Sequence, residues 1–336
     1  MKFSNFAFRL TQSKMKTLDD YRIEIETAIK NLQFPEGKLD TLYAPIKYAL
    51  SAGGKRIRPV LTLMAADAFG DKSSQAVLPA VGLETYHNFT LLHDDVMDKS
   101  EMRRGRLTVH KKYNENTAIL SGDTMLTLAT EYVSKVSDSL LRNVLDTFNN
   151  MSIKVYEGQQ LDMDFEKEEN IALDDYILMI QSKTGALLGA CAKIGALIGG
   201  ASDKDADKMY DFGMQTGVAF QIQDDWLDTF GDATTFGKNI GGDINNAKKT
   251  YLYVAALQHD SQTAAALRDA FKIPAGDLRV KAVTRIYEKL GINDSTKKAV
   301  NHYSSLALKA LNSTSLSDDK KEVFRKFAEK LIGRKK

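Results

Sequence analysis

The chain has 336 residues, enough for one large domain or two of ordinary size. Its composition, 43% hydrophobic and 27% charged, is that of a soluble globular protein. The net charge of +2 is too small for general nucleic-acid binding, and no apolar run approaches the roughly eighteen residues that span a bilayer. We therefore expect no nucleic-acid partner and no transmembrane segment.

The first fourteen residues differ from the rest. They carry Lys2, Arg9 and Lys14, and no acidic residue precedes Asp19. This pattern is that of a weak transit or surface-active peptide, but Met15 also offers a simpler start of translation. We predict that residues 1–14 form a disordered extension without a catalytic role, and that residues 15–336 form a single domain.

Long stretches of the chain carry apolar residues at every third or fourth position, without the alternation of a strand. Examples are residues 176–197 and 205–230. Glycine and aspartate clusters separate such stretches at residues 69–72, 199–203 and 231–235. We therefore predict an all-α protein of roughly ten or more helices, packed as a single large helical bundle.

A glycine pair followed by cations stands near the start of this pattern. Gly53 and Gly54 precede Lys55, Arg56 and Arg58. Glycine lets the backbone approach a ligand closely, and arginine can bind phosphate through two parallel hydrogen bonds. Taken alone, such a cluster is more often a solvated surface patch. Further cations recur at Arg103, Arg104, Lys183, Lys238, Lys248 and Lys249.

Two short acidic runs carry the strongest chemical signal. Residues 94–98 and 224–228 both have the pattern Asp-Asp-x-x-Asp in helical surroundings. Residues four apart share one face of an α-helix, so the first and last carboxylates of each run project together. They repel each other unless a cation lies between them, and Mg²⁺ prefers oxygen ligands together with phosphates. One run alone would be read as a solvated face, but two copies favour a metal site.

The acidic runs and the cations together indicate the ligand. A diphosphate held through Mg²⁺ would use the acidic runs, and a second diphosphate held directly would use lysine and arginine. The chain has no phosphate-binding loop of the nucleotide type, no dinucleotide fingerprint and no zinc motif, so these ligands are not expected. An apolar bundle interior suits a hydrocarbon attached to the diphosphate.

The single cysteine, Cys191, lies among small apolar residues. We interpret it as a buried core residue and not as a nucleophile. One cysteine cannot form a disulfide within the chain, which fits a reducing, cytoplasmic setting.

Six motifs, taken in order, resemble those of the trans-isoprenyl diphosphate synthases, the polyprenyl synthetase family. They are residues 53–59 (Gly-Gly-Lys-Arg-Ile-Arg-Pro), 84–98, 103–105 (Arg-Arg-Gly), 183–185 (Lys-Thr-Gly), 220–228 and 237–238 (Gly-Lys). Each motif alone is weak, but the set in this order is specific. The resemblance covers residues 42–252 and continues more weakly to the C-terminus.

The resemblance implies a fold, a reaction and partners. Family members are all-helical bundles, usually homodimers, in which both acidic runs face one cavity. They condense isopentenyl diphosphate with an allylic diphosphate (dimethylallyl, geranyl or farnesyl) head to tail. The family uses Mg²⁺, with three ions suggested, and Mn²⁺ can substitute. The short-chain members of the geranylgeranyl type are the most similar.

The resemblance also implies a role for each motif residue. Three aspartates would hold the magnesium cluster on the allylic diphosphate: Asp94, Asp98 and Asp224. The other aspartates of the two runs would support it: Asp95, Asp225 and Asp228. The cations on the same diphosphate would be Arg103, Lys183 and Lys238. Isopentenyl diphosphate would be held by Lys55, Arg58, His87 and Arg104. The reacting centre would be lined by Gln221 and Thr184.

The implied reaction needs no protein nucleophile. Neutralisation of the allylic diphosphate by Mg²⁺, lysine and arginine would let its carbon–oxygen bond break. The double bond of isopentenyl diphosphate would then attack the allylic cation, in a site that excludes water. We expect the released diphosphate to accept the proton that is lost, so the aspartates are not assigned as general acids or bases.

Product length is expected to depend on two residues before Asp94. Phe89 and Thr90 stand five and four residues before it. In the family, one bulky ring beside a small residue at this place resembles the C20 pattern, whereas a farnesyl (C15) or longer-chain product is the alternative. Ordinary core packing by Phe89 would also explain the ring.

Two other functions fit the sequence less well. A class I terpene cyclase would carry an Asn/Ser/Glu pattern in place of residues 224–228 and would not need the cations of residues 55–58. A catalytically silent regulatory subunit would have lost motif residues, whereas both acidic runs are intact here.

Overall fold

The computed structural model describes residues 15–231 and 240–333, which are mostly helical with almost no strand, so the all-α prediction is confirmed. The predicted extension 1–14 and Lys238 lie outside the described residues. The helices are α1 (Leu18–Lys30), α2 (Asp40–Leu50), α3 (Ile57–Gly70), α4 (Ser73–Met97), α5 (Val109–Lys112), α6 (Glu115–Val133), α7 (Asp138–Phe165), α8 (Leu173–Ile180), α9 (Ala186–Gly199), α10 (Asp203–Phe230), α12 (Gly242–Asn245), α13 (Tyr251–Leu257), α14 (Ser261–Lys272), α15 (Asp277–Lys289), α16 (Ile292–Asn312) and α17 (Asp318–Ile332).

Two elements interrupt this helical pattern. A π-helical turn, η1 (Gln181–Gly185), joins α8 to α9. A small antiparallel hairpin follows the first acidic run, with β1 (Met102–Arg103) paired to β2 (Arg106–Leu107). Both elements carry residues that the sequence assigns to the site.

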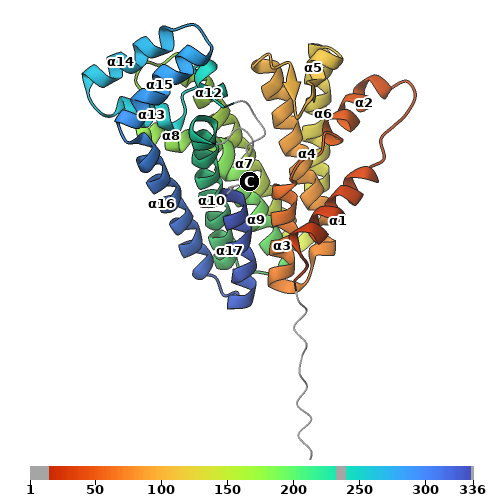
Figure 1. Cartoon of the computed structure of the whole chain (residues 1–336). Coiled ribbons are helices and arrows are strands. Elements are labelled where there is room, and N and C mark those ends of the chain that lie inside the picture. Colours follow the sequence, from red (N-terminus) through yellow and green to blue (C-terminus); the bar gives the residue numbers. More distant parts are fainter. Residues whose placement is uncertain (1–14, 232–239, 334–336) are drawn as a thin grey trace, which may run out of the picture.

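The helices form two groups that meet at the lower end of the molecule and diverge towards the upper end (Figure 1). One group contains α1 to α6 and the other contains α8, α10 and α12 to α17, with α7 and α9 between them. The acidic runs lie at the C-terminal ends of α4 and α10. Both ends lie in the upper part of the molecule, in different groups of helices.

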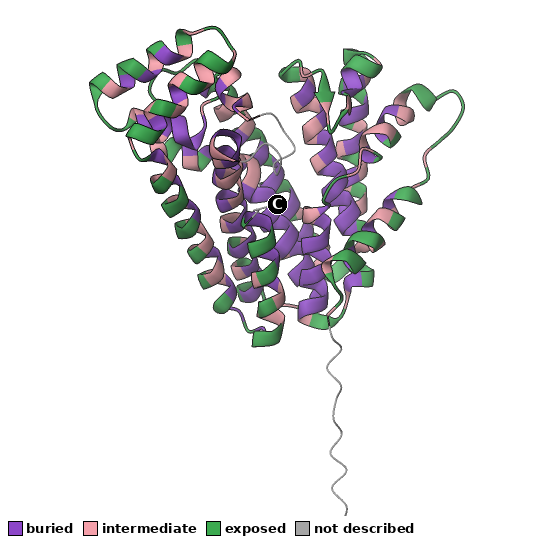
Figure 2. Ribbon diagram, viewed as in Figure 1, coloured by how far each residue is buried: buried purple, intermediate pink, exposed green. Residues whose placement is uncertain are grey.

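The core lies where the two groups meet. Helix α9 is buried along its length except at Lys193, and it packs against α3 and α10. A Cβ on Gly195 would lie 2.2 Å from the carbonyl oxygen of Thr62, so only glycine allows α3 and α9 to approach this closely. Figure 2 shows the buried residues concentrated along these inner helices, with exposed residues on the outward faces.

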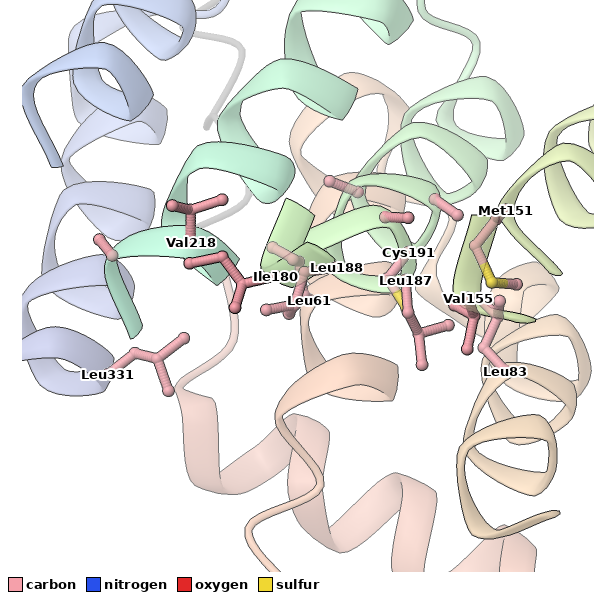
Figure 3. Close-up of a cluster of buried hydrophobic side chains, with 14 of the residues drawn as sticks. Leu61, Leu83, Met151, Val155, Ile180, Leu187, Leu188, Cys191, Val218 and Leu331 are labelled. Carbon is pink, nitrogen blue, oxygen red and sulfur yellow. The ribbon is translucent and has the colours of Figure 1, made fainter. Parts of the chain in front are cut away.

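Side chains from several helices interlock in this core. Figure 3 shows Leu61 of α3 beside Leu188 of α9, and Met151 and Val155 of α7 near Leu83 of α4. Cys191 is fully buried, and burial raises the pKa of its thiol to about 12. It is therefore a core residue and a poor nucleophile, as the sequence predicts.

The helix ends fall where the sequence places them. Helix α3 ends at Gly70, α9 ends at Gly199 and α10 ends at Phe230. Gly200 adopts a left-handed backbone (φ +96°) after α9, and the Ser202 hydroxyl accepts the Asp205 amide at the start of α10. Across residues 15–231 and 240–333, none of the helices is long and apolar enough to cross a membrane.

Candidate active site

The first acidic run lies where α4 ends, with Asp98 as its C-cap. Asp94 is partly buried, and its Oδ1 is buried without a hydrogen-bond partner, 3.6 Å from Lys183 Nζ. Desolvation and the neighbouring Asp94 raise the pKa of Asp98, although Lys183 opposes this shift. A carboxylate oxygen without a hydrogen bond, next to a second carboxylate that it repels, fits a divalent cation.

The middle aspartate of this run is held by the protein. Asp95 is buried, and Arg103 donates to both of its carboxylate oxygens at 2.7–2.9 Å. Arg103 Nη2 also lies 3.5 Å from Asp94 Oδ2. Burial raises the pKa of Asp95 while Arg103 opposes the rise. Asp95 therefore fixes Arg103 beside Asp94.

The second acidic run also has a middle aspartate that the protein holds, but with neutral donors. Asp225 is buried and accepts Gln221 Nε2 at 3.0 Å and the Tyr251 amide at 2.8 Å. The hydroxyl of Tyr176 donates to the same carboxylate. Burial and Asp243 raise the pKa of Asp225 to about 7, against the effects of the nearby Lys248 and of these hydrogen bonds.

The remaining aspartates of the second run differ in their surroundings. Asp224 is partly buried on α10. Asp228 is buried, and its carboxylate accepts the amide of Asp243 at 2.9 Å. Its backbone carbonyl accepts the amide of Gly241, so Asp228 holds the turn before α12 against α10.

The π-helical turn η1 serves both acidic runs. Lys183 Nζ lies 2.5 Å from Asp162 of α7 and 3.6 Å from Asp94. The adjacent Thr184 hydroxyl donates to Gln221 Oε1 at 3.1 Å. Consecutive side chains point in different directions around a helix, about 100° apart in the α form. Two neighbouring residues can therefore reach groups on α4 and α10.

Lys248 connects the two runs electrostatically. Desolvation opposes its charge, but Asp243, Asp225, Asp162 and Asp94 outweigh this effect and raise its pKa. Asp94 belongs to the first run and Asp225 to the second, so the structure brings both runs within the field of one lysine. A pocket lies at this place, lined by Asp162, Tyr176, Met179, Ile180, Lys183, Thr184, Gln221, Asp225, Lys248, Lys249 and Thr250.

The carboxylates fit a metal that brings its own ligands. In the described part of the chain, no three acidic, histidine or cysteine side chains are already gathered around a possible metal position. Lys183 instead lies between Asp94 and Asp162. Because Mg²⁺ usually takes one or two protein carboxylates and completes its shell with water and phosphate, this arrangement suits entry of the ion with a diphosphate.

The glycine pair contacts the hairpin through Arg104, whereas Asp95 contacts it through Arg103. Gly54 has φ +138°, and the Arg104 guanidinium carbon lies 3.1 Å from the place of a Cβ there. Arg104 also donates to the Gly53 carbonyl. Arg104 therefore occupies the space that a side chain on residue 54 would fill. The sequence alone suggests that this space serves the approach of a ligand. Lys55 is exposed next to this loop.

Arg58 and His87 form a second part of this cationic region. Arg58 Nη1 lies 3.1 Å from His87 Nε2. Burial, together with Arg58 and Arg104, holds the pKa of His87 well below its usual range. The ring is therefore neutral, and its Nε2 accepts from Arg58. The Nε of Arg58 is buried without a hydrogen-bond partner.

Arg56, between these residues in sequence, has a structural role. It is buried and pairs with Glu84 at 2.7 Å and with Glu26 at 2.8 Å. It also donates to the Leu50 carbonyl at 2.7 Å. These bonds fix the start of α3, and they explain why Arg56 differs from Lys55 and Arg58.

Phe89 lies in a cluster of rings. It is buried, with ring centroids 4.8 Å from His93, 5.6 Å from Tyr86 and 6.3 Å from Tyr156. The Thr90 hydroxyl donates to the His87 carbonyl at 2.9 Å. This packing gives Phe89 a clear core role, and its influence on product length stays a prediction.

Sequence reasoning missed several residues at this site. Asp162 and Tyr176 carried no signal that separates them from ordinary helix residues. Lys248 belongs to a cationic cluster that the sequence does not assign to the site, and Asp243 belongs to no motif. Each becomes recognisable only when α7, α8, α10, α12 and the turn after α12 are brought together.

Comparison with known proteins agrees with this geometry. The polyprenyl synthetase family profile matches residues 39–290. The chain belongs to the polyprenyl synthetase family. It is a prenyltransferase, and the predictions of family and enzyme class are confirmed.

Individual proteins match over most of the chain. A geranylgeranyl diphosphate synthase of Methanosarcina mazei is 39% identical over 236 residues, 70% of this chain and 72% of that protein. The crystal structure of a geranylgeranyl pyrophosphate synthase has a TM-score of 0.90 at 37% identity, covering 96% of this chain and 100% of that one. A geranylgeranyl pyrophosphate synthase of Corynebacterium glutamicum, solved with isoprenyl diphosphate and magnesium, has a TM-score of 0.80 at 25% identity, covering 95% and 97%.

Proposed function

We propose that this prenyltransferase condenses isopentenyl diphosphate with an allylic diphosphate, head to tail and with Mg²⁺, to give geranylgeranyl diphosphate. The observation that carries the proposal is that Lys183 lies 3.6 Å from Asp94 of the first run, while Lys248 lies in the field of Asp94 and of Asp225 of the second run. Such a site suits a ligand that brings both a divalent ion and negative oxygens. The similarity to geranylgeranyl synthases supports the C20 product.

On the allylic side, Asp94, Asp98 and Asp224 would hold Mg²⁺, with Asp95, Asp225 and Asp228 in support. When bound, the ion neutralises the leaving diphosphate. Lys183 now pairs with Asp162 and Asp94, and Lys248 lies in the field of four carboxylates. A bound metal would replace this neutralisation, so both lysines would turn to phosphate oxygens. Arg103 and Lys238 would add further positive charge.

At the reacting carbon, Gln221 and Thr184 would act together. Gln221 Nε2 donates to the Asp225 carboxylate, which leaves Oε1 as the end that meets Thr184. Its partial negative charge would therefore face the allylic group, where positive charge develops as the carbon–oxygen bond breaks. The orientation of this amide is set by Asp225.

Isopentenyl diphosphate would bind directly to cations, without metal. Arg104 and Lys55 lie at the glycine loop, and Arg58 is held by the neutral ring of His87. A neutral His87 adds no further charge that would have to be desolvated, while it keeps the Arg58 guanidinium in a fixed direction. The two diphosphates would thus be bound differently: the allylic diphosphate through Mg²⁺, and isopentenyl diphosphate through cationic side chains alone.

The direct test is a condensation assay. The enzyme is incubated with Mg²⁺, labelled isopentenyl diphosphate and, in turn, dimethylallyl, geranyl or farnesyl diphosphate, and the product chain is measured. We expect a C20 diphosphate from each starter and no product after chelation of the metal. A C15 or longer chain would replace the C20 assignment. Release of a cyclic hydrocarbon, or activity only with a second related chain, would overturn the proposal.

Product length can be tested at Phe89. We expect Phe89→Ala to lengthen the product, because removing the ring deepens the space below the first acidic run. Phe148→Leu is the matched control, since Phe148 packs on Tyr86 in the same cluster, with ring centroids 5.4 Å apart, but lies on α7. The control should keep C20. An unchanged product in Phe89→Ala would leave this ring with a packing role alone.

The remaining predictions concern the assembled enzyme. We propose a homodimer, because α6 and α7 expose apolar side chains that a second copy would cover: Ile119, Leu120 and Ile153. Light scattering of the purified protein tests this assembly. Titration with Mg²⁺ tests whether three ions bind, and assays with Mn²⁺ test whether this ion can replace Mg²⁺. The cytoplasmic location of the protein stays a prediction.

A further inference from the structure

The hairpin that carries Arg103 and Arg104 is too short to hold its own position. Its two strands have two residues each, and isolated hairpins are marginal even when longer. Arg104 and Gly105 form its turn, both with positive φ (+52° and +72°). The two arginines point to different partners, Arg103 to Asp95 and Arg104 to the Gly53 carbonyl. Other groups must therefore fix the hairpin against both α4 and the glycine loop.

Tyr48 of α2 supplies the fixation on the loop side. Its hydroxyl donates to the Leu107 carbonyl of β2 at 2.8 Å. The Arg106 guanidinium carbon lies 4.0 Å from the centroid of its ring, and Lys112 Nζ lies 3.7 Å from it. The ring thus contacts one cation of β2 and one of α5 (Val109–Lys112), and such contacts are favourable in partly buried positions. Tyr48 is half-buried, so it is not a simple core residue.

The same part of the chain leads into the glycine loop. Helix α2 ends at Leu50, directly before the loop that contains Gly53 and Gly54. Arg106 of β2 donates to the Ser51 hydroxyl at 3.2 Å. Tyr48 and Ser51 therefore tie the hairpin to the start of this loop, and their bonds set where Arg104 lies above it.

The two arginines depend on this connection to different extents. Arg103 has a separate anchor, because it donates to both oxygens of Asp95 on α4. The contact of Arg104 with the Gly53 carbonyl instead joins hairpin to loop, so it requires both to be held together. Loosening Tyr48 should therefore disturb Arg104 more than Arg103.

We propose that Tyr48 is a positioning residue for isopentenyl diphosphate, which fixes Arg104 over the glycine loop without contributing to the allylic side. This inference rests on the proposed function, since it takes Arg104 as a ligand of isopentenyl diphosphate. It predicts that a change at Tyr48 weakens the binding of isopentenyl diphosphate and leaves the binding of the allylic diphosphate almost unchanged.

The test compares Tyr48→Phe and Tyr48→Leu in the full-length enzyme, with both substrates varied. Tyr48→Leu should raise KM for isopentenyl diphosphate by about tenfold, and Tyr48→Phe, which keeps the ring, by about threefold. The kcat and the KM for the allylic diphosphate should change less than about twofold. Tyr43→Leu is the matched control on α2, because Tyr43 packs on Phe34 with ring centroids 5.9 Å apart; its constants should match those of the wild type.

A second measurement separates positioning from general damage. Hydrogen exchange of residues 101–108 in the free enzyme should quicken in Tyr48→Leu and not in Tyr43→Leu. A fall in kcat together with equal rises in both KM values would overturn the inference. An unchanged KM for isopentenyl diphosphate would overturn it as well.

Arg104→Ala decides whether a failure belongs to the inference or to the proposed function. If Arg104→Ala raises KM for isopentenyl diphosphate and the Tyr48 variants do not, the positioning role is wrong and the proposed site stands. If Arg104→Ala leaves this KM unchanged as well, the proposed assignment of Arg104 is wrong, and the inference falls with it.

Discussion

The two acidic runs have the same sequence pattern but different electrostatics. In the first run, the middle residue Asp95 is paired with the charged Arg103. In the second run, the corresponding Asp225 is bound by Tyr176, Gln221 and a backbone amide, none of which carries a charge. The pKa of Asp225 rises to about 7 as a result of burial and of Asp243. Identical motifs therefore do not imply identical charge states.

The largest expected effect comes from the first aspartate of each run, where the two runs should behave alike. Asp94→Ala and Asp224→Ala should each lower kcat at least about a hundredfold, because each removes a group that neutralises the leaving diphosphate. Steady-state kinetics at saturating Mg²⁺ measures both. A near-normal rate in either variant would mean that the two runs do not share one ligand.

The middle aspartates should behave differently from each other. Asp95→Asn removes the charged partner of Arg103 and should cost about 2–3 kcal/mol in the free energy of unfolding. Asp225→Asn keeps an oxygen acceptor of the same shape for neutral donors and should cost about 1 kcal/mol. Urea unfolding of both variants at pH 7 compares them. Equal costs would show that the nature of the donors does not matter.

A pH dependence from Asp225 should also separate the two runs. Its pKa is about 7 when folded and near 3.8 when unfolded, so between these values the folded state holds a proton that the unfolded state has released. Stability from this group is therefore present at low pH and is lost as pH rises towards 7. Between pH 5.5 and 7 the wild type should lose about 1–2 kcal/mol relative to Asp225→Asn, which lacks the group. A constant difference would contradict the raised pKa.

The helical fold was predictable because its signals are local. Apolar periodicity gave residues 176–197 and 205–230 as helices, and the glycines at 70, 199 and 231 marked real ends. The π-helical turn η1 was not predictable, since Lys183 and Thr184 lie in a continuous helical pattern. Its distortion depends on packing: a Cβ on Gly158 of α7 would lie 2.4 Å from the Lys183 amide nitrogen.

The site was predictable as a set of residues, but not in its contacts. The motifs indicated Lys55, Arg56 and Arg58 as one cationic cluster. The structure separates Arg56 from the others because Glu26 of α1 and Glu84 of α4 bind it. Such partners come from distant parts of the chain, so no spacing within the motif reveals them. The same holds for Tyr176 and Asp225.

The π-helical turn has a consequence for how this region tolerates change. Lys183 faces α4 and α7 while its neighbour Thr184 faces α10, and both directions follow from one turn of backbone. Inserting or deleting a residue between Ile180 and Ala186 would rotate one side chain away from its partner whatever amino acid is chosen. The length of this segment should therefore be more strictly constrained than its composition, and segment exchange between related enzymes should succeed only when the residue count is kept.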